Sequence, residues 1–174
     1  MFDIPNVLKL VIQRTWVSLT TFPGIRGWLE SLALFLVVAI PAYFLTTMNG
    51  WFDKPAHTEP SIWWAIFVGA FFAPALFEEI IMRAWLVPHP SENVTKRWRR
   101  NVIIGALFFF VIVHPINGLL AGGLLGETFL RPEFIVIVTI LGAVCHLSYQ
   151  RTGSIWAPTL IHALIVAAWG ILRG

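Results

Sequence analysis

The feature that most constrains this chain is a group of three ionisable side chains inside a long apolar segment. The segment runs from Ile62 to Val87 and contains Glu78, Glu79 and Arg83. It is longer than the about 20 residues that a helix needs to cross a bilayer. A charged side chain at that depth costs roughly 2.5–3.5 kcal/mol on insertion scales. Three of them in one segment therefore indicate a site inside a membrane-embedded protein.

The spacing of these residues indicates which of them lacks a local partner. Glu79 and Arg83 are four positions apart with the acid first, the order that favours an ion pair along one helix face. Glu78 points about 100° away around the helix, and the residue four positions after it is Met82. We expect Arg83 to neutralise Glu79 and Glu78 to be able to act as a general base. A purely structural buried network is the alternative.

Composition places the chain in a membrane. Apolar residues make up 57% of the 174 residues and charged residues 12%, whereas soluble domains carry about 25% charged residues. The basic run at residues 96–100 fits the excess of Lys and Arg on the cytoplasmic side of membrane spans, so nucleic acid is not an expected partner. The single cysteine, Cys145, excludes an internal disulfide framework.

The hydropathy pattern predicts an all-α fold, a polytopic transmembrane helical bundle of about five spans that follows an N-terminal interfacial helix. Residues 1–28 form the interfacial segment, because residues 7–21 are amphipathic and too polar to span. Residues 29–174 form a single transmembrane domain. The spans are expected at residues 30–48, 62–87, 102–116, 132–149 and 154–172.

Proline and glycine predict two local features. Pro74 lies four residues before Glu78 and removes a backbone donor, so we expect a bend next to the charged group. The segment Gly118–Leu130 contains four glycines. An external loop and a re-entrant segment both remain open for it, because irregular backbone is tolerated at membrane depth only when protein surrounds it.

The distribution of Lys and Arg predicts a cytoplasmic N-terminus. With that orientation, eight cations lie on the cytoplasmic side and three outside. The eight are Lys9, Arg14, Arg26, Lys96, Arg97, Arg99, Arg100 and Arg151, and the three are Lys54, Arg131 and Arg173. An odd number of spans then places the C-terminus outside.

Two histidines fall at depths compatible with the charged group. At about 1.5 Å per residue, Glu79 lies roughly 13 Å from the cytoplasmic end of its span, His162 roughly 12 Å from the same side, and His114 about 20 Å from it. A cavity inside the membrane that faces the cytoplasm is the simplest arrangement in which these side chains share water.

Three motifs in this order resemble a known family. They are Glu78-Glu79-x-x-x-Arg83, Phe110-x-x-x-His114, and the run 152–158, Thr-Gly-Ser-Ile-Trp-Ala-Pro, which leads into His162. The pattern is similar to that of the CPBP family of intramembrane endopeptidases, which includes type II CAAX prenyl proteases and bacteriocin-processing, Abi-like proteins. The resemblance covers roughly residues 62–169.

The resemblance implies a role for each residue. Glu78 would be the catalytic glutamate and, with His114, would activate a water that attacks a peptide carbonyl. His162 would help to stabilise the oxyanion, while Glu79 and Arg83 would hold the geometry of the site. Phe110 would belong to the motif of His114.

One position departs from the family pattern. The family often has Asn four residues after the last histidine, where this chain has Val166. Loss of one oxyanion-hole donor costs about 10²–10³ in rate. Asn117, which lies close after His114, is a candidate substitute donor.

A metal site has to be weighed against these roles. One glutamate and two histidines, Glu78, His114 and His162, match in type the His₂Glu set of catalytic zinc sites. The sequence has no H-E-x-x-H spacing, so we favour a site without a cofactor and keep zinc as the alternative.

Cys145 and His146 are neighbours and point in different directions on a helix, so we interpret them as packing residues. His89 is expected to be solvated in a loop.

Three functions remain open. The leading hypothesis is an intramembrane endopeptidase that cleaves a membrane-anchored peptide or protein, with or without a prenyl group. The alternative is a catalytically idle family member that acts as a scaffold, an immunity factor or a subunit with partners in a membrane complex. A proton or ion conductor is the third, and the lack of an inverted repeat argues against it. Membrane lipid surrounds the protein in every case.

Overall fold

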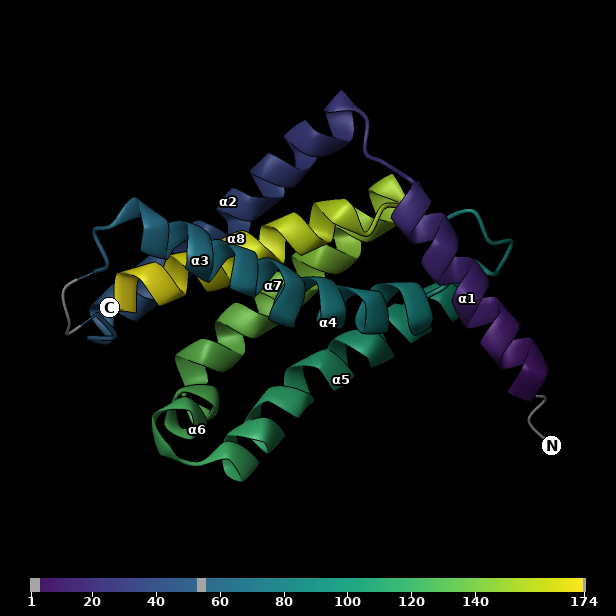
Figure 1. Ribbon diagram of the computed structural model, residues 1–174. Coiled ribbons are helices and arrows are strands. Elements are labelled where there is room, and N and C mark those ends of the chain that lie inside the picture. Colours follow the sequence, from purple (N-terminus) through teal and green to yellow (C-terminus); the bar gives the residue numbers. More distant parts are fainter. Residues whose placement is uncertain (1–3, 53–55, 174) are drawn as a thin grey trace.

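The computed structural model describes residues 4–52 and 56–173, whose regular secondary structure is helical, with no β-strand among them (Figure 1). The single helices are α1 (Ile4–Thr20), α2 (Ile25–Met48), α5 (Lys96–Ala121), α6 (Gly123–Leu130), α7 (Pro132–Thr152) and α8 (Trp156–Arg173). Between α2 and α5, one long helix consists of four consecutive parts, α3 (Pro60–Ala70), η1 (Phe71–Leu76), α4 (Phe77–Glu79) and η2 (Ile80–Trp85). Lys54 lies outside the described residues, and the division of the chain at residue 28 stays a prediction.

Five helical segments are long and apolar enough to cross a membrane. They are α2, the composite helix Pro60–Trp85, α5, α7 and α8. Large apolar side chains such as Leu36, Phe72, Phe108 and Leu119 are exposed on the outside of the bundle. Contact with water would cost about 25 cal/mol for each Å² of such surface, and contact with acyl chains avoids this cost. The protein is an integral membrane protein, and the predicted polytopic helical bundle is confirmed.

The glycine-rich segment after His114 is helical. The third span, expected to end at residue 116, continues to Ala121 with Pro115 inside it, and α6 then folds back along α5. The two helices approach closely at Gly118 and Gly126, since a Cβ atom on Gly126 would lie 2.6 Å from the carbonyl oxygen of Gly118. The glycines therefore allow a tight helical hairpin, and they do not form a structureless loop.

The bend predicted at Pro74 is present. Ala73, directly before it, has φ −142° and ψ 116°, which interrupts the helix. The turns on both sides of α4 are wide π-type turns, a feature that is frequent at functional sites. The bend separates α3 from the short segment that carries Glu78 and Glu79.

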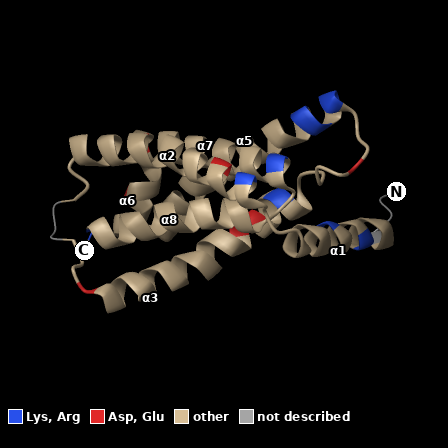
Figure 2. Ribbon diagram, turned by 90° about the horizontal axis from the view of Figure 1, so that it is seen from above, with Lys and Arg blue, Asp and Glu red and all other residues tan. Residues whose placement is uncertain are grey.

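Helix α1 lies at the end of the molecule opposite the C-terminus and is tied to the bundle by hydrogen bonds (Figure 1). The Ser18 hydroxyl bonds to the Tyr149 hydroxyl at 2.8 Å, and the Trp156 indole N–H donates to the Leu19 carbonyl at 2.8 Å. Arg14 binds Glu92 through two hydrogen bonds of 2.7 Å. The Lys and Arg residues of this end of the bundle gather around α1 and the start of α5 (Figure 2).

The loop that follows the composite helix is ordered by polar contacts. His89 was expected to be solvated, but it is buried, with Nε2 3.0 Å from the Gly153 carbonyl and Nδ1 2.7 Å from the Ser91 hydroxyl. Burial alone would raise the pKa of the Glu92 carboxyl, but hydrogen bonds from Arg14 and from the His89 backbone N–H lower it. The prediction for His89 was wrong because this loop packs on the α7–α8 turn.

Candidate active site

Glu79 and Arg83 form the ion pair that their spacing predicts. Nη1 of Arg83 lies 3.0 Å from Oε1 of Glu79, and both side chains are fully buried. Nη2 of Arg83 donates to the Gly142 carbonyl at 3.1 Å, and the guanidinium lies 5.0 Å from the centre of the Phe110 ring. The cation is therefore held by a carboxylate, a carbonyl and an aromatic face, which offset part of its desolvation cost.

His162 connects the two glutamates. Its Nδ1 lies 2.9 Å from Oε1 of Glu79, and its Nε2 lies 3.9 Å from Oε2 of Glu78. Because an ionised carboxylate can only accept hydrogen bonds, Nδ1 carries a proton. Glu79 thus fixes the orientation and tautomer of the imidazole, as a buried carboxylate does in hydrolytic triads, and turns Nε2 toward Glu78.

Glu78 is the carboxylate without a cation of its own. Its side chain is 29% exposed and lines a cavity. Within the described part of the chain, no Lys or Arg lies within 4 Å of it, and its Oε2 is buried without a hydrogen-bond donor. The distinction between Glu78 and Glu79 that the spacing predicts is present in the structure.

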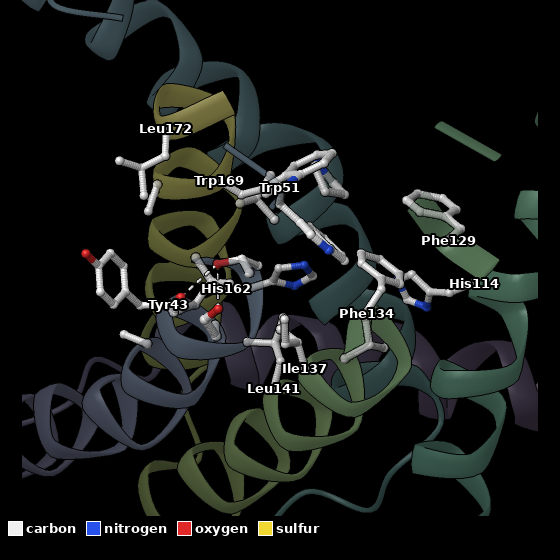
Figure 3. A pocket seen from close by; sticks show the side chains of 18 of the residues that line it. Tyr43, Trp51, His114, Phe129, Phe134, Ile137, Leu141, His162, Trp169 and Leu172 are labelled. Carbon is white, nitrogen blue, oxygen red and sulfur yellow. Dashed lines mark hydrogen bonds between the residues drawn. The ribbon is translucent and has the colours of Figure 1, made fainter. Parts of the chain in front are cut away.

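His114 lines the same cavity from α5. Its Nδ1 donates to the Phe110 carbonyl at 2.7 Å, so Nε2 is the nitrogen that can act as an acceptor. Its ring lies 4.9 Å from Phe110 and 5.7 Å from both Phe129 and Phe134, measured between ring centres. Figure 3 shows His114 beside Phe134, with His162 on the other side of the cavity. The aromatic cage fixes the imidazole.

The cavity has a volume of about 460 Å³ and mostly apolar walls, within the range of about 300–1,000 Å³ that is usual for ligand pockets. Its polar side chains besides Glu78, His114 and His162 are few, mainly Tyr43 and Thr46. Its apolar lining includes Phe35, Ala39, Ala42, Trp51, Phe129, Phe134, Ile137, Leu141, Ile165, Val166, Trp169 and Leu172.

We expected the cavity to open toward the basic end of the bundle, but it lies on the other side of the charged residues. Its walls come from the C-terminal halves of α2 and α8, from α6 and from the start of α7, which lie toward the C-terminal end of the molecule. The expectation of a cavity on the basic side was wrong because that end is closed. Ala84, Val87, Tyr149 and Ile155 are completely buried there, under α1.

Of the other residues singled out in the sequence, Phe110 and Val166 lie at the site and Asn117 does not. Phe110 is fully buried, and its ring contacts the rings of both His114 and His162. Val166 lines the cavity. Asn117 is exposed and is not part of the lining, so the structure does not bring it to the site.

The sequence did not indicate one part of this network. His146 is buried, as predicted for a packing residue, and its Nδ1 donates at 2.8 Å to the Gly142 carbonyl, which also accepts from Arg83. The four-residue spacing from Gly142 to His146 is the only sequence signal for this contact, and such a spacing is common in helices.

The zinc alternative depends on whether the possible ligands lie close together. Among residues 4–52 and 56–173, no three His, Cys, Asp or Glu side chains are grouped so that they could hold a metal ion. Arg83, bound to Glu79, also brings a positive charge close to the two glutamates.

A comparison with protein families decides the relationship of the chain. The family model described as "Type II CAAX prenyl endopeptidase Rce1-like" matches residues 59–168, more than half of the chain. The chain belongs to this family. The region matched to the Rce1-like family contains Glu78, Glu79, Arg83, His114 and His162, so the resemblance in the three motifs is confirmed. No curated protein and no solved structure matches the chain.

The buried pair predicts an asymmetry in stability. Arg83→Met should lower the free energy of unfolding by about 3–5 kcal/mol, because it leaves the Glu79 carboxylate buried without its cation. Glu78→Gln, a matched change at the neighbouring carboxylate, should alter it by less than about 1 kcal/mol. Equilibrium unfolding in detergent micelles measures both. Equal losses for the two variants would contradict the assignment.

Proposed function

We propose that this member of the Rce1-like family is a glutamate-dependent intramembrane endopeptidase. The observation that carries the proposal is the Glu78 carboxylate, which faces an apolar cavity without a cation partner in the described residues and lies 3.9 Å from Nε2 of His162. Membership of the family supports a CAAX-type intramembrane protease. The substrate is a membrane-anchored peptide or protein, with or without a prenyl group.

The proposed reaction is hydrolysis by an activated water. Glu78, aided by His114, takes a proton from a water, whose oxygen forms a bond to the carbonyl carbon of the peptide. Glu78 then returns the proton to the amide nitrogen, the C–N bond breaks, and a carboxylic acid and an amine leave. Both side chains line the cavity in which the peptide would bind.

His162 is the proposed oxyanion donor. Its Nδ1–H is directed to Glu79, so Nε2 can donate to the oxyanion only when this nitrogen also carries a proton. Val166 lies one turn later and contributes only an apolar wall. The proposed oxyanion site therefore depends on His162 alone, because Val166 stands where the family often has an Asn donor.

The apolar side chain at Val166 also supports the alternative of an idle scaffold or complex subunit. A stable membrane complex that co-purifies with the protein and is unchanged by Glu78→Gln and His162→Ala would favour this alternative over the enzyme.

The catalytic roles predict the kinetics of the variants. Glu78→Gln should lower kcat by about 10³-fold or more and His114→Ala by about 10²–10⁴-fold, because each removes a proton-transfer group. The binding of substrate should change little. Cleavage of membrane-anchored fluorescent peptides, prenylated and unprenylated, by protein in nanodiscs gives kcat and KM. Glu127→Gln, at an exposed carboxylate on α6 that does not line the cavity, is the control. Full activity of Glu78→Gln would remove the proposed base.

We also propose that the N-terminus is cytoplasmic, because cations gather at the end of the bundle formed by α1 and the start of α5 (Figure 2). The cavity then lies in the half of the bundle away from the cytoplasm. Asn93→Cys should resist a membrane-impermeant maleimide in intact cells, and Glu127→Cys should react. Cys145 is buried and gives little background. The reverse labelling pattern would contradict the proposed orientation and place the N-terminus outside.

A further inference from the structure

The first two turns of α5 carry a high concentration of positive charge. The helix begins with Lys96, Arg97, Trp98, Arg99 and Arg100, and its first turn contains no acidic residue. The N-terminal end of a helix is itself positive, so it favours acidic side chains and disfavours cations. The charge at the start of α5 therefore does not serve the stability of the helix.

The protein neutralises little of this charge. Arg99 is turned toward the protein, where Nη1 donates to the Pro88 carbonyl at 3.0 Å, but a carbonyl carries no net charge. The side chains of Lys96, Arg97 and Arg100 are exposed, and none of them has a carboxylate within 4 Å among residues 4–52 and 56–173. These three cations thus lack a counterion within the described chain.

The carboxylates of the same end of the bundle are already used. Glu92 binds Arg14, with 2.7 Å between Oε2 and Nη2, and Glu30 binds Arg151, with 3.3 Å between Oε2 and Nη1. A counterion for the start of α5 therefore has to come from outside the described residues.

The three cations share one face of α5 with an exposed apolar stripe. Lys96 and Arg97 lie four and three positions before Arg100, which places all three on the same side of the helix. The same side continues at four-residue intervals with Ile104 and Phe108, which are 58% and 68% exposed. One helix face is therefore cationic over its first turns and apolar over the next ones.

The depth of this face matches one leaflet of a bilayer. Phe108 follows Arg100 by about 12 Å along the helix axis, and one leaflet contributes about 15 Å to a hydrocarbon core of about 30 Å. Figure 2 shows the cations at the start of α5 at the outer edge of the bundle. The positive-inside rule explains why cations gather at this end, but it does not explain why three of them continue the line of the apolar stripe.

We propose that Lys96, Arg97 and Arg100 bind the phosphate of an anionic phospholipid, whose acyl chains pack on Ile104 and Phe108. Arginine binds phosphate through two parallel hydrogen bonds, and the net negative charge of a phosphatidylglycerol headgroup supplies the missing counterion. A zwitterionic headgroup brings a cation of its own and fits this face less well. The proposal does not depend on the protease activity.

Binding of the lipid also has a structural consequence. Arg99, between the cations, donates to the Pro88 carbonyl and, at 2.8 Å, to the Glu92 carbonyl, so it ties the start of α5 to the loop that follows the composite helix. A ligand that binds only the folded protein stabilises it. Phosphatidylglycerol should therefore raise the Tm of the protein in neutral detergent more than phosphatidylcholine does.

Native mass spectrometry in neutral detergent tests the site with phosphatidylglycerol and phosphatidylcholine of identical acyl chains. The wild-type protein should bind phosphatidylglycerol at least tenfold more tightly. Arg97→Gln combined with Arg100→Gln should lower the affinity for phosphatidylglycerol at least tenfold, because each cation near an anionic surface contributes a factor of about five. Lys9→Gln combined with Arg26→Gln removes two other exposed cations and should leave the preference unchanged.

A charge-conserving variant guards against misfolding. Arg97→Lys combined with Arg100→Lys keeps both charges and should retain the preference for phosphatidylglycerol. Equal affinities for the two lipids in the wild-type protein would overturn the proposal. Equal losses in the two Gln double variants would also overturn it, because they would indicate a general effect of positive charge. Displacement of the lipid by an equimolar amount of inorganic phosphate would assign the cations to free phosphate and contradict the lipid site.

Discussion

The structure depends on burying one arginine and two carboxylates in a membrane-embedded bundle. Such charges are tolerated only when other groups replace their hydration. Arg83 meets this condition through Glu79, the Gly142 carbonyl and the face of Phe110. These contacts join the composite helix to α5 and α7, and the bond from His162 to Glu79 joins it to α8. Because Glu79 is used in this network, Glu78 is the carboxylate left to face the cavity.

The local part of this arrangement could be predicted from the sequence, because it depends on helix geometry alone. Four-residue spacing pairs Glu79 with Arg83, long apolar runs give the five spans, and Pro74 gives the bend. The features that were missed depend on contacts between distant segments. The cavity lies where it does because α1 closes the basic end. His89 is buried because its loop packs on the α7–α8 turn. Gly118 allows α5 to approach α6 closely at Gly126. No periodic pattern in the sequence encodes them.

The cavity gives the two ends of the site different chemistry. One end holds a carboxylate and two imidazoles that hydrogen bonds and aromatic rings keep in place. The other holds aromatic side chains covered by two arginines. Between them the walls are apolar, which suits a substrate that reaches the site from the lipid phase. Under the proposed function, the first end would activate the water and the apolar walls would bind the peptide.

The central claim is that Glu78, and not Glu79, is the carboxylate available to a ligand in the membrane. An apolar carbodiimide enters membrane proteins from the lipid and modifies accessible buried carboxyl groups, and peptide mass spectrometry locates the adduct. Our account predicts that Glu78 is modified and that Glu79, enclosed by Arg83 and His162, is not. Modification of Glu79 in the folded protein, or of neither residue, would contradict it.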